Sequence, residues 1–171
     1  MDFTYKLLID TREKEISHII DRLKANNIDI EYKKLDVGDY KIQLTSLDGE
    51  PINYSPRVVI ERKKLDEIIA NLLGEKDENG KTRLHRELDR SFKDKIRLII
   101  LIEDLDWYNK LLTSDYISRV NPKAIRGMIM SLEAKYPNVS IVGIDKSRSA
   151  SYIHTTLYYH LRQRLKEIKG S

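Results

Sequence analysis

Glu61 and Lys63 stand two residues apart at the end of an apolar segment, and this spacing could support hydrolysis of a phosphodiester bond. The preceding Val58, Val59 and Ile60 are β-branched and predict a buried strand. Residues two apart on a strand share a face, so the carboxylate and the ammonium would point the same way. A carboxylate can hold a hard divalent cation, and a lysine can orient water or neutralise a phosphoryl transition state. Many solvated sheet edges also end in Glu-Arg-Lys, and this segment alone leaves both interpretations open.

A second carboxylate belongs to a tight turn upstream. Gly38 is free to adopt positive φ, and Asp39 follows it and opens an alternating strand over residues 40–44. A similar strand over residues 28–32 precedes the turn, so the pattern predicts a hairpin. If the hairpin lies beside the apolar segment described above, Asp39 and Glu61 can converge on one cation. The alternative is that the acidic residues here only form the turn.

A third apolar strand, near the N-terminus, also ends in charge. Residues 4–9 lead into Asp10-Thr11-Arg12-Glu13. Asp10 could join the acidic cluster, and Arg12 could contact a phosphate. Alternatively, Asp10 or Thr11 caps a helix predicted from Arg12 to about Asn26, with Glu13 at its positive end.

Taken together, these segments resemble the nuclease domain of the XPF/Mus family of structure-specific DNA endonucleases. The resemblance covers roughly residues 5 to 165. It rests on Asp10-Thr11-Arg12-Glu13, Val37-Gly38-Asp39-Tyr40, Ile60-Glu61-Arg62-Lys63-Lys64-Leu65-Asp66, Arg83-Leu84 with Glu87 and Arg90, and Asn121-Pro122-Lys123-Ala124-Ile125-Arg126-Gly127. Each motif alone is common, but their ordered combination is specific.

The resemblance implies a single α/β domain over residues 1–171. Its fold would be the three-layer, restriction-endonuclease-like arrangement, in which helices flank a mixed central sheet. The order of predicted strands and helices agrees with this architecture. The implied site residues are Asp39, Glu61 and Asp10 around Mg²⁺ or Mn²⁺, Lys63 to orient or activate water, Arg62 and Arg12 to hold the charged scaffold or contact phosphate, and Arg83, Arg90 and Lys64 to contact DNA.

The function implied is a metal-dependent endonuclease that cuts DNA at or near flaps, forks or junctions, in repair, recombination or replication. An alternative is a catalytically silent subunit of such a nuclease, which binds DNA or supports dimerisation. The presence of Asp39, Glu61 and Lys63 argues for the enzyme. A third possibility, an assembly domain without a nucleic-acid role, predicts no metal affinity and little salt dependence of DNA binding.

The composition excludes several other classes of protein. The 171 residues include no cysteine, so disulfides and thiolate zinc sites are ruled out. Lys and Arg exceed Asp and Glu by 31 to 27, a mild basic excess that permits a polyanionic partner such as double-stranded or branched DNA. No apolar run approaches the roughly 18 residues of a membrane helix, and no signal-peptide layout begins the chain. We therefore expect an intracellular protein without a membrane partner.

The C-terminal half predicts further strands over residues 96–102 and 140–144, and a last helix capped by Ser147. That helix carries a long apolar stripe of Ile153, Leu157, Leu161, Leu165 and Ile168. The resemblance implies a homodimer through the C-terminal helices, whereas packing on the chain's own core would explain the stripe equally well. Nothing after residue 147 resembles the helix-hairpin-helix module that family members commonly append, so we expect weaker and less structure-selective DNA binding than in full-length relatives.

Overall fold

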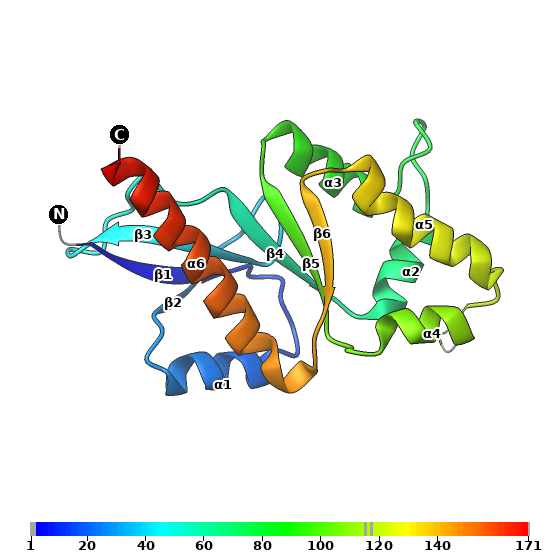
Figure 1. The fold of residues 1–171 in the computed structure, drawn as a ribbon, viewed down its shortest axis with the longest axis horizontal. Coiled ribbons are helices and arrows are strands. Elements are labelled where there is room, and N and C mark those ends of the chain that lie inside the picture. Colours follow the sequence, from blue (N-terminus) through cyan, green and yellow to red (C-terminus); the bar gives the residue numbers. More distant parts are fainter. Residues whose placement is uncertain (1–2, 115, 117, 171) are drawn as a thin grey trace. The chain divides into compact units, whose positions relative to one another are not determined.

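The computed structural model describes residues 3–114, 116 and 118–170, and its central feature is a six-stranded mixed sheet of order β2-β1-β3-β4-β5-β6 (Figure 1). The strands are β1 Phe3–Ile9, β2 Ile30–Tyr32, β3 Tyr40–Ser46, β4 Val58–Lys63, β5 Arg97–Ile102 and β6 Val139–Gly143. Strand β1 runs parallel to β2 and antiparallel to β3, β3 runs antiparallel to β4, and β5 runs parallel to β6. The predicted α/β class with a mixed sheet is confirmed.

The chain forms two compact units, and β4 passes from one to the other. One unit comprises the residues up to Ile60 together with those from Ser147 onward, and the other comprises Glu61–Lys146. Among the described residues, none of the helices combines the length and apolar character needed to cross a lipid bilayer.

In the first unit, helices α1 (Ser17–Ala25) and α6 (Ser149–Lys169) pack against each other, and α6 also contacts β3 (Figure 1). The apolar stripe of α6 buries Ile153, Leu157 and Leu161 completely or almost completely. Only its end, at Leu165 and Ile168, is left half-buried. Most of the apolar stripe of α6 therefore packs on the chain's own core, which is the alternative to dimerisation given in the sequence analysis.

The second unit holds β5 and β6 together with four helices, namely α2 (Leu65–Leu73), α3 (Arg83–Lys93), α4 (Trp107–Thr113) and α5 (Pro122–Lys135). A short 3₁₀ turn, η1 (Lys146–Arg148), leads from it into α6. Residues 98–102 of β5 are all buried, which explains their continuous apolar run. Helix α5 begins with Pro122, and the Asn121 side chain accepts a hydrogen bond from the Lys123 amide at 2.9 Å.

The predicted hairpin before β4 is wrong. Strand β2 does not pair with β3, because β1 lies between them. Helix α1 carries the chain from β1 to β2 in a parallel crossover, so β2 takes the outer side of β1 and the returning β3 takes the inner side. Residues 33–39 therefore cross from one side of β1 to the other and are not a two-strand turn.

Two predicted helix starts are also wrong. The N-cap position of α1 is Ile16, and Glu15 just before it has a φ of 54°, so neither Asp10 nor Thr11 caps this helix. Glu13 likewise lies outside α1. The N-cap position of α6 is Arg148, one residue after the predicted Ser147. Asp10 is thus available for the different task described below.

Gly38 carries a testable packing constraint. Its φ is +74°, and a Cβ placed there would lie 2.9 Å from the Cβ of Val59. Gly49 has a similar φ of +85°, but a Cβ there would meet nothing within 4 Å. Gly49→Ala should therefore cost only the left-handed backbone penalty of about 1–2 kcal/mol. Gly38→Ala should lose a further 1–3 kcal/mol or so through overpacking against β4.

Urea unfolding of the two variants beside the parent protein measures this difference. Because Gly49→Ala shares the backbone strain, the excess loss at position 38 isolates the contact with Val59. Equal losses in the two variants would contradict this account of Gly38.

Candidate active site

Asp10 is a buried carboxylate that ties together the segments following β1. It is 1% exposed, and its two oxygens accept four hydrogen bonds. Three come from Arg12, through its backbone amide at 2.8 Å, Nε at 2.7 Å and a terminal nitrogen at 2.9 Å. The fourth comes from the Leu35 amide at 2.7 Å, and the Arg12 guanidinium also donates to the Leu35 carbonyl at 2.8 Å.

These contacts set the protonation state of Asp10. Burial is the largest single influence and would raise the pKa of the carboxyl group. The hydrogen bonds from Arg12 and Leu35, with the positive charge of Arg12, outweigh burial and lower the pKa to about 2. Asp10 is therefore a carboxylate at any pH at which the protein would function.

Asp39 is fixed by its backbone at the start of β3. Its amide donates to the Ile60 carbonyl at 2.8 Å, and its carbonyl accepts from the Asp10 amide at 2.8 Å. Asp39 precedes Tyr40, which pairs with Ile60 in the β3–β4 ladder. The buried hydroxyl of Tyr40 donates to a carboxylate oxygen of Glu13 at 2.7 Å, so Glu13 anchors the start of β3.

Glu61 and Lys63 form an ion pair on β4, as the two-residue spacing predicted. The Lys63 Nζ lies 3.0 Å from Oε1 of Glu61. The Glu61 side chain is 8% exposed and that of Lys63 is 19% exposed, so both charges lie mostly out of water. Screening by solvent is therefore weaker for this pair than for a surface ion pair.

Arg62, between these two residues, pairs with a residue that the sequence did not point to. Its guanidinium contacts the carboxylate of Glu103, and the two side chains are only 11% and 3% exposed. The Glu103 amide also donates to the Lys63 carbonyl at 3.4 Å. Glu103 directly follows the buried strand β5, and a carboxylate at the end of an apolar segment is the same kind of sequence signal as Glu61.

The side chains offer few donors for a metal. Among residues 3–114, 116 and 118–170, no three His, Asp or Glu side chains form a group that could hold a metal ion. The oxygens of Asp10 already accept from Arg12 and Leu35, so its contacts support a positioning role. Asp39 and Glu61 are the other two predicted ligands, and Mg²⁺ commonly takes only one or two carboxylates together with water and substrate phosphate.

Lys64 lies at the N-cap position of α2 and lines a charged cavity of about 250 Å³. Its amide donates to the Glu67 carboxylate at 2.9 Å. Lys110 and Lys146 line the same cavity, as does Asp104, which forms an ion pair with Lys110 at 2.5 Å. Lys64 thus stands in a mixed environment of lysines and carboxylates.

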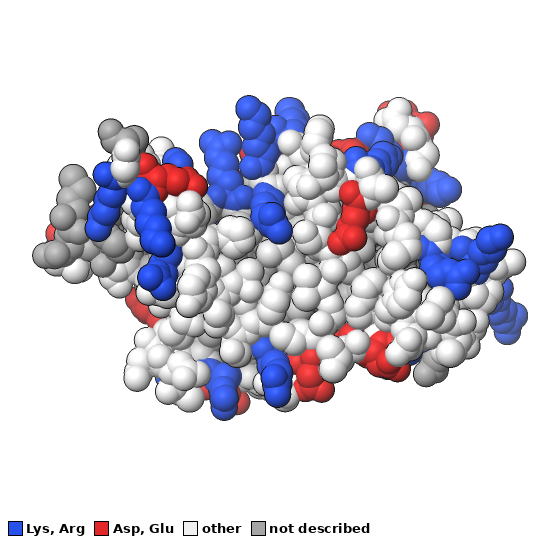
Figure 2. All heavy atoms as spheres, in the orientation of Figure 1, with Lys and Arg blue, Asp and Glu red and all other residues white. Residues whose placement is uncertain are grey.

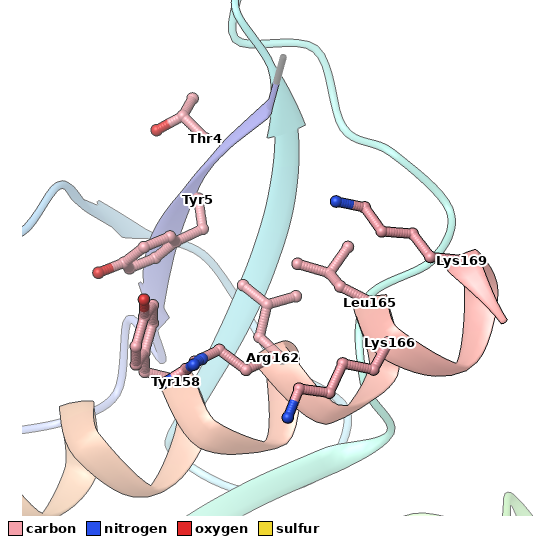
Figure 3. A pocket seen from close by; sticks show the side chains of 8 residues that line it. Thr4, Tyr5, Tyr158, Arg162, Leu165, Lys166 and Lys169 are labelled. Carbon is pink, nitrogen blue, oxygen red and sulfur yellow. The ribbon is translucent and has the colours of Figure 1, made fainter. Parts of the chain in front are cut away.

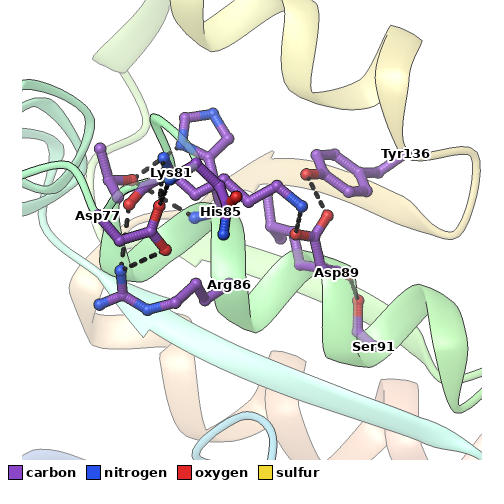
Figure 4. Close-up of polar contacts among 10 residues, drawn as sticks. Asp77, Lys81, His85, Arg86, Asp89, Ser91 and Tyr136 are labelled. Atoms are coloured by element: carbon purple, nitrogen blue, oxygen red, sulfur yellow. Dashed lines mark hydrogen bonds and ion pairs between the residues drawn. The ribbon is translucent and has the colours of Figure 1, made fainter.

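The predicted DNA-contacting Arg83 and Arg90 have exposed side chains seven residues apart on α3 and so face the same way. A network of polar contacts holds this helix and the loop before it (Figure 4). Asp77 accepts from the amides of Asn79 and Lys81 at 2.9 Å, and Arg86 lies 3.2 Å from its other oxygen.

The same network continues to α5. Lys81 forms an ion pair with Asp89 at 2.5 Å, and the Tyr136 hydroxyl donates to Asp89 at 2.8 Å (Figure 4). Burial, reinforced by this bond to Asp89, raises the pKa of Tyr136 to about 12, so the phenol keeps its proton. The two exposed arginines are therefore presented by a helix that is anchored at both ends.

Asp10 yields a prediction for stability against pH. Its pKa falls from the ordinary 3.8 to about 2 on folding, so its stabilising contribution is complete above pH 3.8 and disappears as the pH falls through 2. The contribution is about 2 kcal/mol. The free energy of unfolding should therefore drop by about 2 kcal/mol more in the parent protein than in Asp10→Asn between pH 5 and pH 2.

Urea unfolding of both proteins across this pH range tests the prediction. Asp36→Asn, an exposed substitution in the segment before β3, controls for the general effect of removing a carboxylate. A gap between the parent and Asp10→Asn that stays constant with pH would show that Asp10 is not a depressed carboxylate.

We compared the chain with curated proteins, with solved structures and with models of protein families. No match is found among curated proteins. Among solved structures, the chain is similar to XPF from Aeropyrum pernix, with a TM-score of 0.61 and 17% identity over 90% of this chain and 66% of that one. A structure of XPF from Aeropyrum pernix in complex with DNA gives a TM-score of 0.57 and 17% identity over 96% of this chain and 66% of that one.

The chain thus spans about two thirds of the length of the XPF chains it matches, and the likeness to them is one of fold. The model of the ERCC4 domain matches residues 9–156, a range that includes β3, β4 and every predicted site residue. The resemblance to XPF/Mus nucleases inferred from the sequence is confirmed. The chain belongs to the ERCC4 domain family.

Proposed function

We propose that this chain is the nuclease domain of a divalent-metal-dependent endonuclease that cuts DNA phosphodiester bonds at or near flaps, forks or junctions. The observation that carries the proposal is the Glu61–Lys63 ion pair of 3.0 Å, mostly out of water at the end of β4. Membership of the ERCC4 domain family and the fold shared with XPF from Aeropyrum pernix, which has been solved in complex with DNA, support it.

Asp39 and Glu61 are the proposed ligands of Mg²⁺ or Mn²⁺. Both are hard oxygen donors, and each adjoins a member of the Tyr40–Ile60 register pair of β3 and β4. When bound, the cation would supply a water of lowered pKa and would stabilise the extra negative charge on the scissile phosphate. We infer a positioning role for Asp10, because its oxygens already accept hydrogen bonds from Arg12 and Leu35.

Lys63 is the proposed partner of the attacking water. Its ammonium group has three donors, so it can hold the Glu61 carboxylate in place and still donate to water or to a phosphate oxygen. Arg62 and Arg12 are the proposed scaffold cations. Each forms an ion pair with a buried carboxylate, Arg62 with Glu103 and Arg12 with Asp10.

Arg83, Arg90 and Lys64 are the proposed DNA contacts outside the reacting atoms. All three side chains are exposed, and arginine forks suit phosphate oxygens. The homodimer through the C-terminal helices and the intracellular location stay predictions. The burial of Ile153, Leu157 and Leu161 within the chain leaves α6 less apolar surface for such a dimer than the sequence suggested.

Cleavage of labelled flap, fork, four-way junction and plain duplex DNA tests the proposal. Each substrate is incubated with Mg²⁺, Mn²⁺ or EDTA. Metal-dependent cuts near a branch are expected from the parent protein. Asp39→Asn and Lys63→Ala should each lower the rate by about 100-fold or more, because each removes a group that stabilises charge in the transition state.

Asp36→Asn is the matched control, since it makes the same chemical change at an exposed position three residues from Asp39. It should cleave within about twofold of the parent, as surface substitutions usually leave a site intact. DNA binding without cleavage in every metal would overturn the enzyme in favour of a silent subunit. Cleavage that survives both Asp39→Asn and Lys63→Ala would refute the assignment of the site.

A further inference from the structure

A groove along the C-terminal half of α6 has a chemistry that the proposed active site does not use. It has a volume of about 390 Å³ and lies between α6 and the start of β1, within the first unit. We refer to it as the α6 groove. Leu161 and Leu165 give it an apolar base, and the side chains that project around this base are shown in Figure 3.

Positive charge dominates the rim of the α6 groove. Arg162, Lys166 and Lys169 line it, and no acidic residue does so in the described part of the chain. Their spacing of four and then three residues places all three cations on one face of the helix. Figure 2 shows Lys and Arg side chains gathered over this end of α6, with a smaller group of acidic atoms beside them.

The helix itself accounts for only part of this arrangement. Lys166 and Lys169 lie in the last turn, where cations are stabilised by the negative end of the helix dipole. That effect does not require the cations to share one face, where they repel one another. A polyanion lying in the groove would remove this repulsion, so the charge pattern indicates an anionic ligand.

Two tyrosine rings in the α6 groove indicate which kind of anion it would bind. Tyr5 and Tyr158 line the groove with their ring centroids 5.5 Å apart and their planes inclined by 45°. The Tyr5 hydroxyl forms a hydrogen bond with His154 Nε2 at 2.9 Å, which fixes the position of this ring. Both rings stand together at one end of the groove, beside Arg162 (Figure 3).

The rings offer aromatic surface and no negative charge. Burial, and to a lesser extent the neighbouring Tyr158, raises the pKa of Tyr5, so its phenol keeps its proton at neutral pH. A groove that combines cations with fixed aromatic rings suits single-stranded nucleic acid, whose bases stack on the rings while its phosphates meet the cations. A duplex does not expose its base faces in this way.

We propose that the α6 groove binds a single-stranded nucleic-acid segment, with phosphates on Lys166 and Lys169 and a base against Tyr158. This groove shares no residue with those proposed for cleavage, and its occupation does not require a metal. For a protein that acts on branched DNA, it would hold an unpaired strand.

The test measures binding of fluorescein-labelled dT15 by anisotropy, in EDTA so that no cleavage occurs. The variants are Lys166→Glu with Lys169→Glu, and separately Tyr158→Leu. The control is Lys24→Glu with Lys123→Glu, which makes the same change in net charge at exposed positions on α1 and α5. Circular dichroism of every variant confirms that it is folded.

The groove lysine pair should lose about tenfold or more in affinity beyond the control pair, and its slope of log K against log salt concentration should flatten by about 1.4, the change for two lost phosphate contacts on a single strand. Tyr158→Leu should bind about tenfold more weakly with an unchanged salt slope, because it removes stacking and no charge. A merely structural effect would not separate the two variants in this way.

Three outcomes would overturn the proposal. Equal losses of affinity in the groove lysine pair and the control pair would show that dT15 is attracted only by the net charge of the protein. Binding by Tyr158→Leu at the parent affinity would remove the base-stacking contact. Sedimentation showing that the groove substitutions dissociate a dimer would assign the groove to a second copy of the chain. Failure of metal-dependent cleavage, by contrast, leaves this binding measurement unaffected.

Discussion

The buried carboxylate of Asp10 is the constraint on which the first unit's charged end depends. Its oxygens accept from Arg12 and Leu35, and its amide donates to the Asp39 carbonyl, so this residue joins the end of β1 to the segment before β3, which is distant in sequence. A carboxylate with 1% exposure is tolerated only when donors surround it. Arg12 and Leu35 supply those donors, and the chain from Asp10 to Asp39 is fixed as a result.

A similar arrangement recurs on β4, where charges are also paired in a place poor in water. Glu61 lies with Lys63, and Arg62 lies with Glu103, all four side chains being less than a fifth exposed. Removing one member would leave its partner buried without compensation, which is costly. Glu61 and Lys63, both proposed to take part in the chemistry, therefore balance each other's charge, and Arg62 and Glu103 form a second balanced pair.

Much of this was predictable from the sequence, and the misses have physical causes. The β-branched segment at Val58 and the two-residue spacing of Glu61 and Lys63 report local geometry, which a strand imposes by itself. The place of β2 in the sheet depends on the crossover from β1, and the local sequence pattern does not determine on which side of β1 the strand pairs. Asp10 resembled a helix cap because one of its hydrogen-bond partners, the Leu35 amide, lies 25 residues away. Glu103 was missed for the same reason, since Arg62 lies 41 residues before it.

The division of the chain into its two units has a consequence for the order in which they fold during synthesis. Glu61–Lys146 form one unit from a continuous segment, whereas the other unit joins the residues up to Ile60 with those from Ser147 onward. In α6, the residues Ile153, Leu157 and Leu161 belong to the core of the first unit, which contains both ends of the sequence. Until α6 has been synthesised, β1 and β3 therefore lack the helix that packs on them. The second unit, Glu61–Lys146, can then complete its folding before the first unit does. During this interval the apolar faces that α6 will cover stay exposed to chaperones and to neighbouring nascent chains.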